Sequence, residues 1–92
     1  MARTLQANNR TYRISAHAWA RIRQIDIDLA DVARIIEAPQ TIQKLKHKTE
    51  YTGCYTPRYA AGTDKRLAVK IVVNTRSTLT LKTAHNLGDC PE

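Results

Sequence analysis

Apolar residues recur at the spacing of an α-helix in two stretches of the first half of the chain. Each stretch has one apolar face, which predicts a short helix that buries this face against another layer of the protein. The apolar positions are Ala18, Ile22 and Ile25 in the first stretch, and Leu29, Val32, Ile35 and Ile36 in the second.

Residue types that begin and end helices flank both stretches. Ser15 and Asp28 precede them, and their side-chain oxygens suit the N-cap position. Pro39 follows the second stretch and cannot continue a helix. We therefore expect one helix from Ser15 to about Asp26 and another from Asp28 to the residues before Pro39. Trp19, the single tryptophan, lies beside the first apolar face and is expected to pack there rather than to stack on a ligand.

From residue 41 onward, apolar residues alternate with polar ones, as in β-strands that have one buried face. Strands are expected at residues 41–48, 51–56, 67–73 and 78–86, with Gly53 as the site of a β-bulge. The third is apolar on part of both faces and is expected at the centre of the sheet. The pattern predicts an α+β fold: two N-terminal helices packed on a four-stranded antiparallel meander sheet, to which residues 11–14 can add an edge strand.

The 92 residues suffice for a single domain with one core. Residues 1–9 and 88–92 show no periodic pattern and are expected to form a loose arm and a loose tail. No stretch resembles a signal peptide or approaches the roughly 20 apolar residues that span a bilayer. Cys54 and Cys90 have no paired spacing, so we expect no disulfide framework and a reducing cytoplasm as the compartment.

Positive charge is concentrated in the second half of the chain. The formal net charge is +7, and residues 41–92 carry nine Lys or Arg against four Asp or Glu. This charge favours a polyanionic partner, nucleic acid before membrane, because no basic amphipathic helix accompanies it. The candidate RNA-binding cations are Arg23, Lys44, Lys46, Lys48, Arg58, Lys70 and Lys82, and the candidate base-stacking side chains are Tyr51, Tyr55 and Tyr59. For each of these, a solvated lysine or a packed tyrosine is the alternative.

Four polar side chains are expected to meet at one edge of a cleft. His17 and Arg21 are four residues apart and share one face of the first helix. Thr83 and His85 alternate in step with Leu79 and Leu81, which must face the helices. Thr83 and His85 are therefore expected to face the helices as well. The alternative is that His17 and Arg21 form an ordinary surface pair.

These residue types suit cleavage of RNA without a metal. The reaction needs a base for the 2′-hydroxyl proton, an acid for the leaving 5′-oxygen, and donors that stabilise the phosphate. His17 and His85 are the candidate base and acid, Arg21 the phosphate clamp, and Thr83 a hydrogen-bond partner of a phosphoryl oxygen. His47 is a weaker third histidine candidate. The chain has no His-x-x-x-His motif and no carboxylate cluster, so neither a metal nor a cofactor is expected.

The order of these residues resembles the signature of a family of small bacterial domains of unknown function that recur at the C-terminal tips of polymorphic toxins. The matching residues are Ser15-x-His17-Ala18-x-x-Arg21-Ile22, then Ile27, Asp31-Val32 and Pro39, and finally Lys82-Thr83-Ala84-His85. The family looks related to barnase, EndoU, tRNA-cleaving colicins and RelE-type toxins. The resemblance thus implies metal-independent ribonuclease activity, with His17, Arg21 and Thr83 at the family's site positions.

The chain departs from this family at three positions. Ile25 and Asp26 stand where the family commonly has Arg and Gly, and His85 stands where it has an aromatic residue. Arg23, on another face of the helix, is a candidate substitute for the missing phosphate ligand. The first two departures put the phosphate clamp in question. His85 in place of an aromatic residue either restores a proton carrier or has no functional meaning.

The leading hypothesis is a small cytoplasmic ribonuclease of toxin type that cuts tRNA or ribosome-bound message and leaves a cyclic phosphate. Its expected partner is an acidic antitoxin or immunity protein that covers the basic cleft. One alternative is a basic RNA- or DNA-binding module without catalysis, which needs the lysines and tyrosines but not the histidines. Another is an interaction protein that has kept the fold and lost the site.

Overall fold

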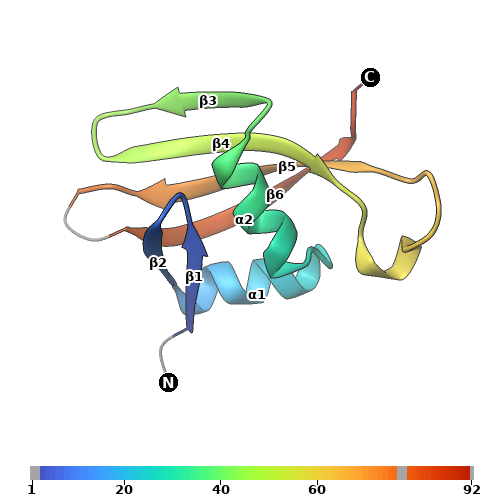
Figure 1. The fold of residues 1–92 in the computed structure, drawn as a ribbon, viewed down its shortest axis with the longest axis horizontal. Helices are drawn as coiled ribbons and strands as arrows, with labels where there is room; N and C mark the ends of the chain where they lie inside the picture. Colours follow the sequence, from blue (N-terminus) through green and yellow to red (C-terminus); the bar gives the residue numbers. More distant parts are fainter. Residues whose placement is uncertain (1–2, 77–78, 92) are drawn as a thin grey trace.

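A single six-stranded sheet organises the molecule, with its strands in the order β1-β2-β6-β5-β4-β3. The computed structural model describes residues 3–76 and 79–91. The strands are β1 (Arg3–Ala7), β2 (Arg10–Ile14), β3 (Thr41–Lys44), β4 (Lys48–Tyr55), β5 (Leu67–Asn74) and β6 (Thr80–Asp89), and the helices are α1 (Ala16–Gln24), α2 (Leu29–Glu37) and the 3₁₀-helix η1 (Arg58–Ala60). Figure 1 shows α2 in front of the sheet and α1 along its β6 side.

The predicted four-stranded antiparallel meander is wrong, because the sheet has six strands and is mixed. β2 pairs in parallel with β6, with Arg13 opposite Thr80 and Ile14 opposite Leu81, whereas the other neighbouring strands are antiparallel. A parallel pair between the beginning and the end of a chain leaves no local pattern in the sequence. Residues 11–14 do form a strand as expected, but β2 lies between β1 and β6 rather than at an edge, and periodicity alone could not place it there.

Residues 3–7 form a strand, so the predicted loose arm is wrong for this part of the chain; residues 1 and 2 lie outside the described residues. Asn8 and Asn9 both have positive φ, at 52° and 60°, which is the geometry of a tight hairpin turn between β1 and β2. The Asn8 backbone N–H donates to Glu37 Oε2 at 3.1 Å, and its side chain donates to the Ile36 carbonyl at 3.3 Å. The hairpin is thus tied to the end of α2.

Both predicted helix N-caps are confirmed. Ser15 Oγ accepts a hydrogen bond from the Ala18 N–H at 3.0 Å, and Asp28 Oδ1 accepts one from the Ala30 N–H at 3.2 Å. α1 ends at Gln24, slightly before the predicted end. Asp26, with φ of 58°, turns the chain from α1 toward α2.

One face of the sheet is covered by the helices and carries the core. Val69, Ile71 and Val73 of β5 are fully buried on this helix-covered face. Gly53 of β4 pairs regularly with Val69, so the predicted bulge at Gly53 is wrong. A Cβ atom at position 53 would lie 2.9 Å from Ile35 of α2, so glycine lets the helix approach the strand closely.

The end of the chain is fixed rather than loose. β6 extends to Asp89, and a disulfide joins Cys90 to Cys54 with a Cα–Cα distance of 5.8 Å. The predicted loose tail and unpaired cysteines are therefore wrong, although Glu92 lies outside the described residues. β4 and β6 both pair with β5, which brings together two cysteines that are 36 residues apart. In the described part of the chain, no helix has the length and apolar character needed to cross a membrane.

Candidate functional site

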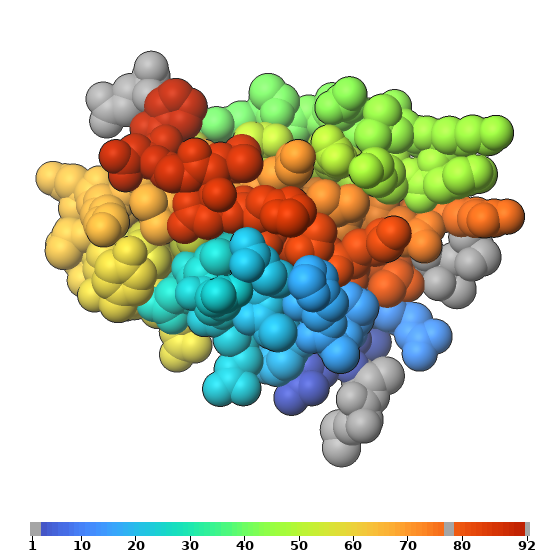
Figure 2. Space-filling view, turned by 180° about the vertical axis from the view of Figure 1, so that it is seen from behind, coloured from blue at the N-terminus to red at the C-terminus, as the bar shows by residue number. Residues whose placement is uncertain are grey.

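α1 lies against the outer edge of β6, beyond the short pairing of β6 with β2. Arg21 Nε donates to the Ala84 carbonyl at 3.2 Å, and another nitrogen of the same guanidinium donates to Gln24 Oε1 at 2.8 Å. Ser15 contributes two more bonds, from its backbone N–H to the Leu81 carbonyl and from Oγ to the Lys82 carbonyl. Figure 2 shows α1 and β6 side by side on the far side of the molecule. Arg21 is therefore an anchor between the helix and the sheet edge.

His17 is exposed on the same flank of α1 as Arg21, one helical turn earlier. Its side chain makes no hydrogen bond or ion pair with the described residues. The imidazole is consequently accessible to a ligand that approaches the boundary between α1 and β6.

A bulge in β6 turns Thr83 and His85 away from the helices. Val73 of β5 pairs with Leu81, but Val72 pairs with Thr83, so Lys82 is an extra residue in the strand. Leu81 and Ala84 are both buried on the helix-covered face, whereas Thr83 and His85 lie on the opposite, open face. The expected shared face of Leu79, Leu81, Thr83 and His85 is therefore wrong, because simple alternation does not hold across a bulge.

The structure separates the roles predicted for Thr83 and His85. Thr83 Oγ1 is buried and has no hydrogen-bond partner within the described residues. It does not contact a phosphate in this arrangement. His85 is exposed, opposite Lys70, and directly follows Ala84, whose carbonyl binds Arg21. The structure thus brings Arg21 and His85 to the same stretch of β6, whereas the side-chain oxygen of Thr83 is shielded from solvent.

Acidic and basic groups are paired on the open face. Glu50 lies 3.6 Å from Lys48 Nζ and 4.0 Å from Lys70 Nζ. This carboxylate partly neutralises both lysines, which lowers their attraction for phosphate. Lys70 is half-buried, so it is less available than the exposed lysines elsewhere.

A single strand at residues 41–48 would place Lys44, Lys46 and Lys48 on one face by alternation, but this expectation is wrong. β3 ends at Lys44, and the Leu45 N–H donates to the Lys48 carbonyl at 2.8 Å across a tight turn. Lys44 pairs with Thr49 on the helix-covered face, whereas Lys48 lies on the open face. Residues in a turn do not alternate between the two faces of a strand, and the periodicity of the sequence did not reveal where β3 ended.

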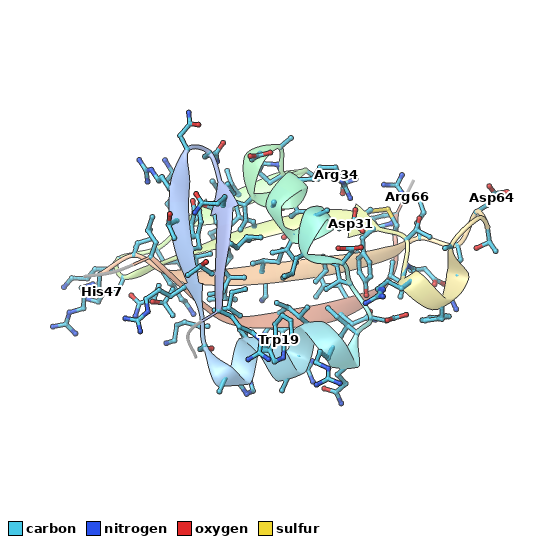
Figure 3. The ribbon with its side chains drawn as sticks, turned by 60° about the horizontal axis from the view of Figure 1, so that its bottom comes forward. Trp19, Asp31, Arg34, His47, Asp64 and Arg66 are labelled. Atoms are coloured by element: carbon cyan, nitrogen blue, oxygen red, sulfur yellow. A yellow bond between two sulfur atoms is a disulfide. The ribbon has the colours of Figure 1, made fainter. Side chains whose placement is uncertain are left out.

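The ends of two hairpins instead form a cluster of positive charge, which we call the basic end. A cavity of about 400 Å³ is lined there by Leu45, Lys46, His47, Lys48, Asn74, Arg76 and Lys82, and none of these is acidic. The Thr75 N–H donates to the His47 carbonyl at 3.0 Å and joins the two hairpins. Figure 3 shows His47 at the far tip of the molecule. Arg76 was not predicted as a binding residue, because it follows a strand in a turn; the pairing of β4 with β5 is the signal that places it here.

The three tyrosines predicted to stack on bases lie in different environments. Tyr55 is 1% exposed, and its hydroxyl donates to the Ile25 carbonyl at 2.7 Å. Burial raises the pKa of Tyr55 to about 12, so the prediction that it stacks on RNA is wrong. Burial, with Tyr12 nearby, also raises the pKa of Tyr51 on the helix-covered face. Tyr59 is 66% exposed, and Lys65 Nζ lies 5.3 Å from its ring centroid.

Arg23 and Arg58 lie in a second cavity, away from the basic end. This cavity of about 460 Å³ is lined by Trp19, Ile22, Arg23, Asp26, Ile27, Asp28, Leu29 and Arg58, and we call it the α1–α2 pocket. Trp19 and Arg23 lie on the flank of α1 opposite His17 and Arg21, by helical spacing. Across residues 3–76 and 79–91, no group of three His, Cys, Asp or Glu side chains is placed to hold a metal ion.

Comparisons with known proteins leave the chain without an assigned relative. No protein-family model matches the sequence. No curated protein and no solved structure matches it either. The resemblance to toxin domains stays a prediction.

Proposed function

We propose that this protein is a small metal-independent endoribonuclease of toxin type that acts where α1 meets β6. The observation that carries the proposal is the hydrogen bond between Arg21 Nε and the Ala84 carbonyl. It holds the flank of α1 that bears His17 and Arg21 against the stretch of β6 that bears His85. The sequence resemblance to ribonuclease toxins supports the same function.

The proposed reaction is attack of the ribose 2′-hydroxyl on the adjacent phosphorus. One of His17 and His85 removes the 2′-hydroxyl proton, and the other protonates the 5′-oxygen as its bond to phosphorus breaks. The products are a 2′,3′-cyclic phosphate and a 5′-hydroxyl end. Arg21 uses two of its five N–H donors within the protein, so three remain for the phosphate oxygens. Thr83 has no role here, because its oxygen is buried.

RNA that enters this site extends toward the basic end in the proposal. Lys46, Arg76 and Lys82 line the cavity there without an acidic neighbour among its lining residues. Lys48 and Lys70 contribute less because Glu50 lies beside both. Phosphate contacts of this kind increase affinity without selecting a sequence.

The cellular setting is part of the same proposal. An acidic antitoxin or immunity protein would cover the basic end, because charge complementarity speeds and orients association. Disulfides persist in oxidising compartments. The Cys54–Cys90 bond therefore suits a toxin domain that folds outside the cytoplasm and then reaches the cytoplasmic RNA of a target cell.

A non-catalytic RNA-binding module is the second candidate function. Two observations favour it: Arg21 is already engaged as an anchor, and the basic end needs no histidine to bind phosphates. This module would bind RNA with the same dependence on salt but would leave it intact. Because no RNA would be cut, replacing His17 or His85 would then change no cleavage product.

The test is incubation of the purified protein with total bacterial RNA in EDTA, with and without ribosomes. His17→Ala and His85→Ala are each compared with His47→Ala, a matched loss of one histidine at the basic end. We expect the wild type, His47→Ala and Thr83→Val to yield cyclic-phosphate ends, and the other two variants to lose at least about a hundredfold in rate. Intact RNA in every sample would refute cleavage, and salt-sensitive binding of that RNA would support the second candidate.

A further inference from the structure

The α1–α2 pocket has the composition of a nucleotide-binding site. It combines the indole of Trp19, the apolar walls of Ile22 and Ile27, two carboxylates and two arginines in about 460 Å³. In Figure 3 the Trp19 side chain stands beside α1, on the side of the molecule that carries α2. The pocket lies on the flank of α1 opposite His17, so a ligand bound there does not depend on RNA cleavage.

Trp19 contributes its partly buried indole to the lining of this pocket. The guanidinium of Arg3 lies 4.2 Å from the centroid of the indole ring and holds it from outside the pocket. Ile22 and Ile27 are almost fully buried, and they form a fixed apolar wall next to the indole. Unpaired bases stack on such aromatic surfaces in nucleic-acid-binding proteins.

Asp26 and Asp28 are held in place by backbone hydrogen bonds. Asp26 Oδ2 accepts from the Tyr59 N–H at 2.7 Å, and Asp28 Oδ1 accepts from the Ala30 N–H at 3.2 Å. Asp26 has φ of 58°, a conformation that Asp and Asn tolerate better than most residues. Each carboxylate keeps further acceptor capacity, and an ionised carboxylate has no donor.

An acceptor-only edge discriminates among the bases. On its Watson–Crick edge guanine presents two adjacent donors, the N1–H and the 2-amino group. Adenine and cytosine present an amino group beside a bare nitrogen acceptor, and uracil presents one N–H between two carbonyls. A carboxylate can accept two parallel hydrogen bonds only from guanine, and it meets a lone pair in each of the other bases.

Arg23 and Arg58 supply positive charge at the same pocket. Neither side chain has a hydrogen bond or an ion pair with another described residue, including the two aspartates. Unpaired guanidinium groups bind phosphate oxygens in a bidentate manner. The pocket therefore pairs donors for a phosphate with acceptors for a base.

We propose that the α1–α2 pocket binds a guanine nucleotide. The base stacks on Trp19, the carboxylate of Asp26 or Asp28 accepts from N1–H and the 2-amino group, and Arg23 and Arg58 hold the phosphate. The ligand class is a guanosine monophosphate, either free or as one residue of an RNA strand.

The wild-type protein provides a direct test, because Trp19 is its only tryptophan and reports on its own pocket. Tryptophan fluorescence is followed while GMP, AMP, CMP, UMP or ribose 5-phosphate is added. We expect saturable quenching by GMP at a concentration at least about tenfold lower than for the other nucleotides. 1-Methyl-GMP, which lacks the N1–H, should bind as weakly as AMP. Equal affinities for GMP and AMP, equal affinities for GMP and its methylated form, or no quenching would each overturn the proposal.

Variants then assign the contacts. Asp26→Asn and Asp28→Asn keep an oxygen for the backbone N–H but add a donor, and at least one of them should weaken GMP binding about tenfold. Asp31→Asn is the matched control, since Asp31 lies on α2 outside the pocket and pairs with Arg34.

The phosphate contact is tested in the same way, by comparing GMP binding of Arg58→Ala with that of Arg66→Ala. His17→Ala should bind GMP as the wild type does, so nucleotide binding and cleavage can fail separately. Unchanged GMP affinity in both aspartate variants would contradict the assignment.

Discussion

The two ends of the β4–β5–β6 sheet differ in how they are held and in what they present. At one end, the Cys54–Cys90 disulfide, the Tyr55–Ile25 hydrogen bond and a bond of 2.9 Å from Arg34 to the Cys54 carbonyl lie close together. At the other, the basic end gathers positive side chains around an open cavity. Figure 3 shows His47 and Arg66 at opposite extremes of the same strands.

This difference indicates that one end of the strands contributes stability and the other end contributes binding. Like charges that lie close together repel each other and oppose folding, so the basic end costs stability. Covalent and buried polar bonds at the stapled end, defined by Cys54, Tyr55 and Cys90, offset that cost. Mutations at the stapled end should therefore change unfolding, and those at the basic end should change binding.

The largest effect is expected from the disulfide. Replacing both cysteines, as Cys54→Ala with Cys90→Ala, frees a loop of 36 residues in the unfolded chain. The free energy of unfolding should fall by about 4 kcal/mol. Urea denaturation of the wild type with and without a reducing agent measures the same loss independently. A change of less than about 1 kcal/mol by both routes would show that the stapled end does not depend on its disulfide.

The next largest effect is expected at the basic end. Lys46→Ala with Lys82→Ala removes two phosphate ligands and should weaken single-stranded RNA binding by about tenfold at low salt. A plot of the logarithm of the association constant against the logarithm of the salt concentration has a negative slope, and the steepness of this slope should decrease by about 1.4. The control is Lys65→Ala with Arg66→Ala, which removes the same charge near the stapled end. If both pairs weaken binding equally, RNA binding depends on net charge rather than on the basic end.

The smallest effect is expected from one hydroxyl at the stapled end. Tyr55→Phe leaves the buried Ile25 carbonyl without its partner and should lower the free energy of unfolding by about 1 kcal/mol at neutral pH. Burial raises the pKa of Tyr55 from 10.0 to about 12, so the unfolded chain loses this proton first. The contribution of Tyr55 to wild-type stability is therefore fully present below pH 10 and is lost as the pH rises toward 12.

Urea denaturation across this pH range compares the two proteins. The variant should show a weaker dependence on pH, because it has lost the contribution of Tyr55 and keeps that of Tyr51, whose pKa is raised in the same direction. Identical pH profiles would mean that Tyr55 ionises as freely in the folded protein as in the unfolded one.

The helices were the most predictable part of the chain. Their apolar stripes and caps are local signals, and Ser15 and Asp28 make the hydrogen bonds that the sequence indicated. The sheet was less predictable, because its mixed order depends on a contact between Ile14 and Leu81. Likewise, nothing in the spacing of Cys54 and Cys90 shows that two strands flanking β5 bring them together.

In the candidate site, one extra residue in β6 means that the alternation of side chains along the sequence no longer predicts which face of the sheet each side chain occupies. Lys82 is exposed and basic, as expected, but as a bulge it places His85 on the face opposite to the predicted one. Arg21 was expected to hold a phosphate, and its bond to a main-chain carbonyl could not be seen without the strand edge. The residues of the α1–α2 pocket come from three separate segments, which explains why the sequence predicted no ligand for Asp26 or Asp28.

The parallel contact between β2 and β6 also sets the order in which the molecule can be assembled. Arg13 and Thr80 are neighbours in the sheet although most of the chain separates them. A topology rich in such distant contacts closes large loops before it gains their energy, and this slows the search for the native state. β6, which follows the five other described strands in the chain, joins the N-terminal hairpin to the rest of the sheet. A nascent chain that lacks β6 therefore has no strand on which to dock β2, and the sheet is completed only after β6 has been synthesised.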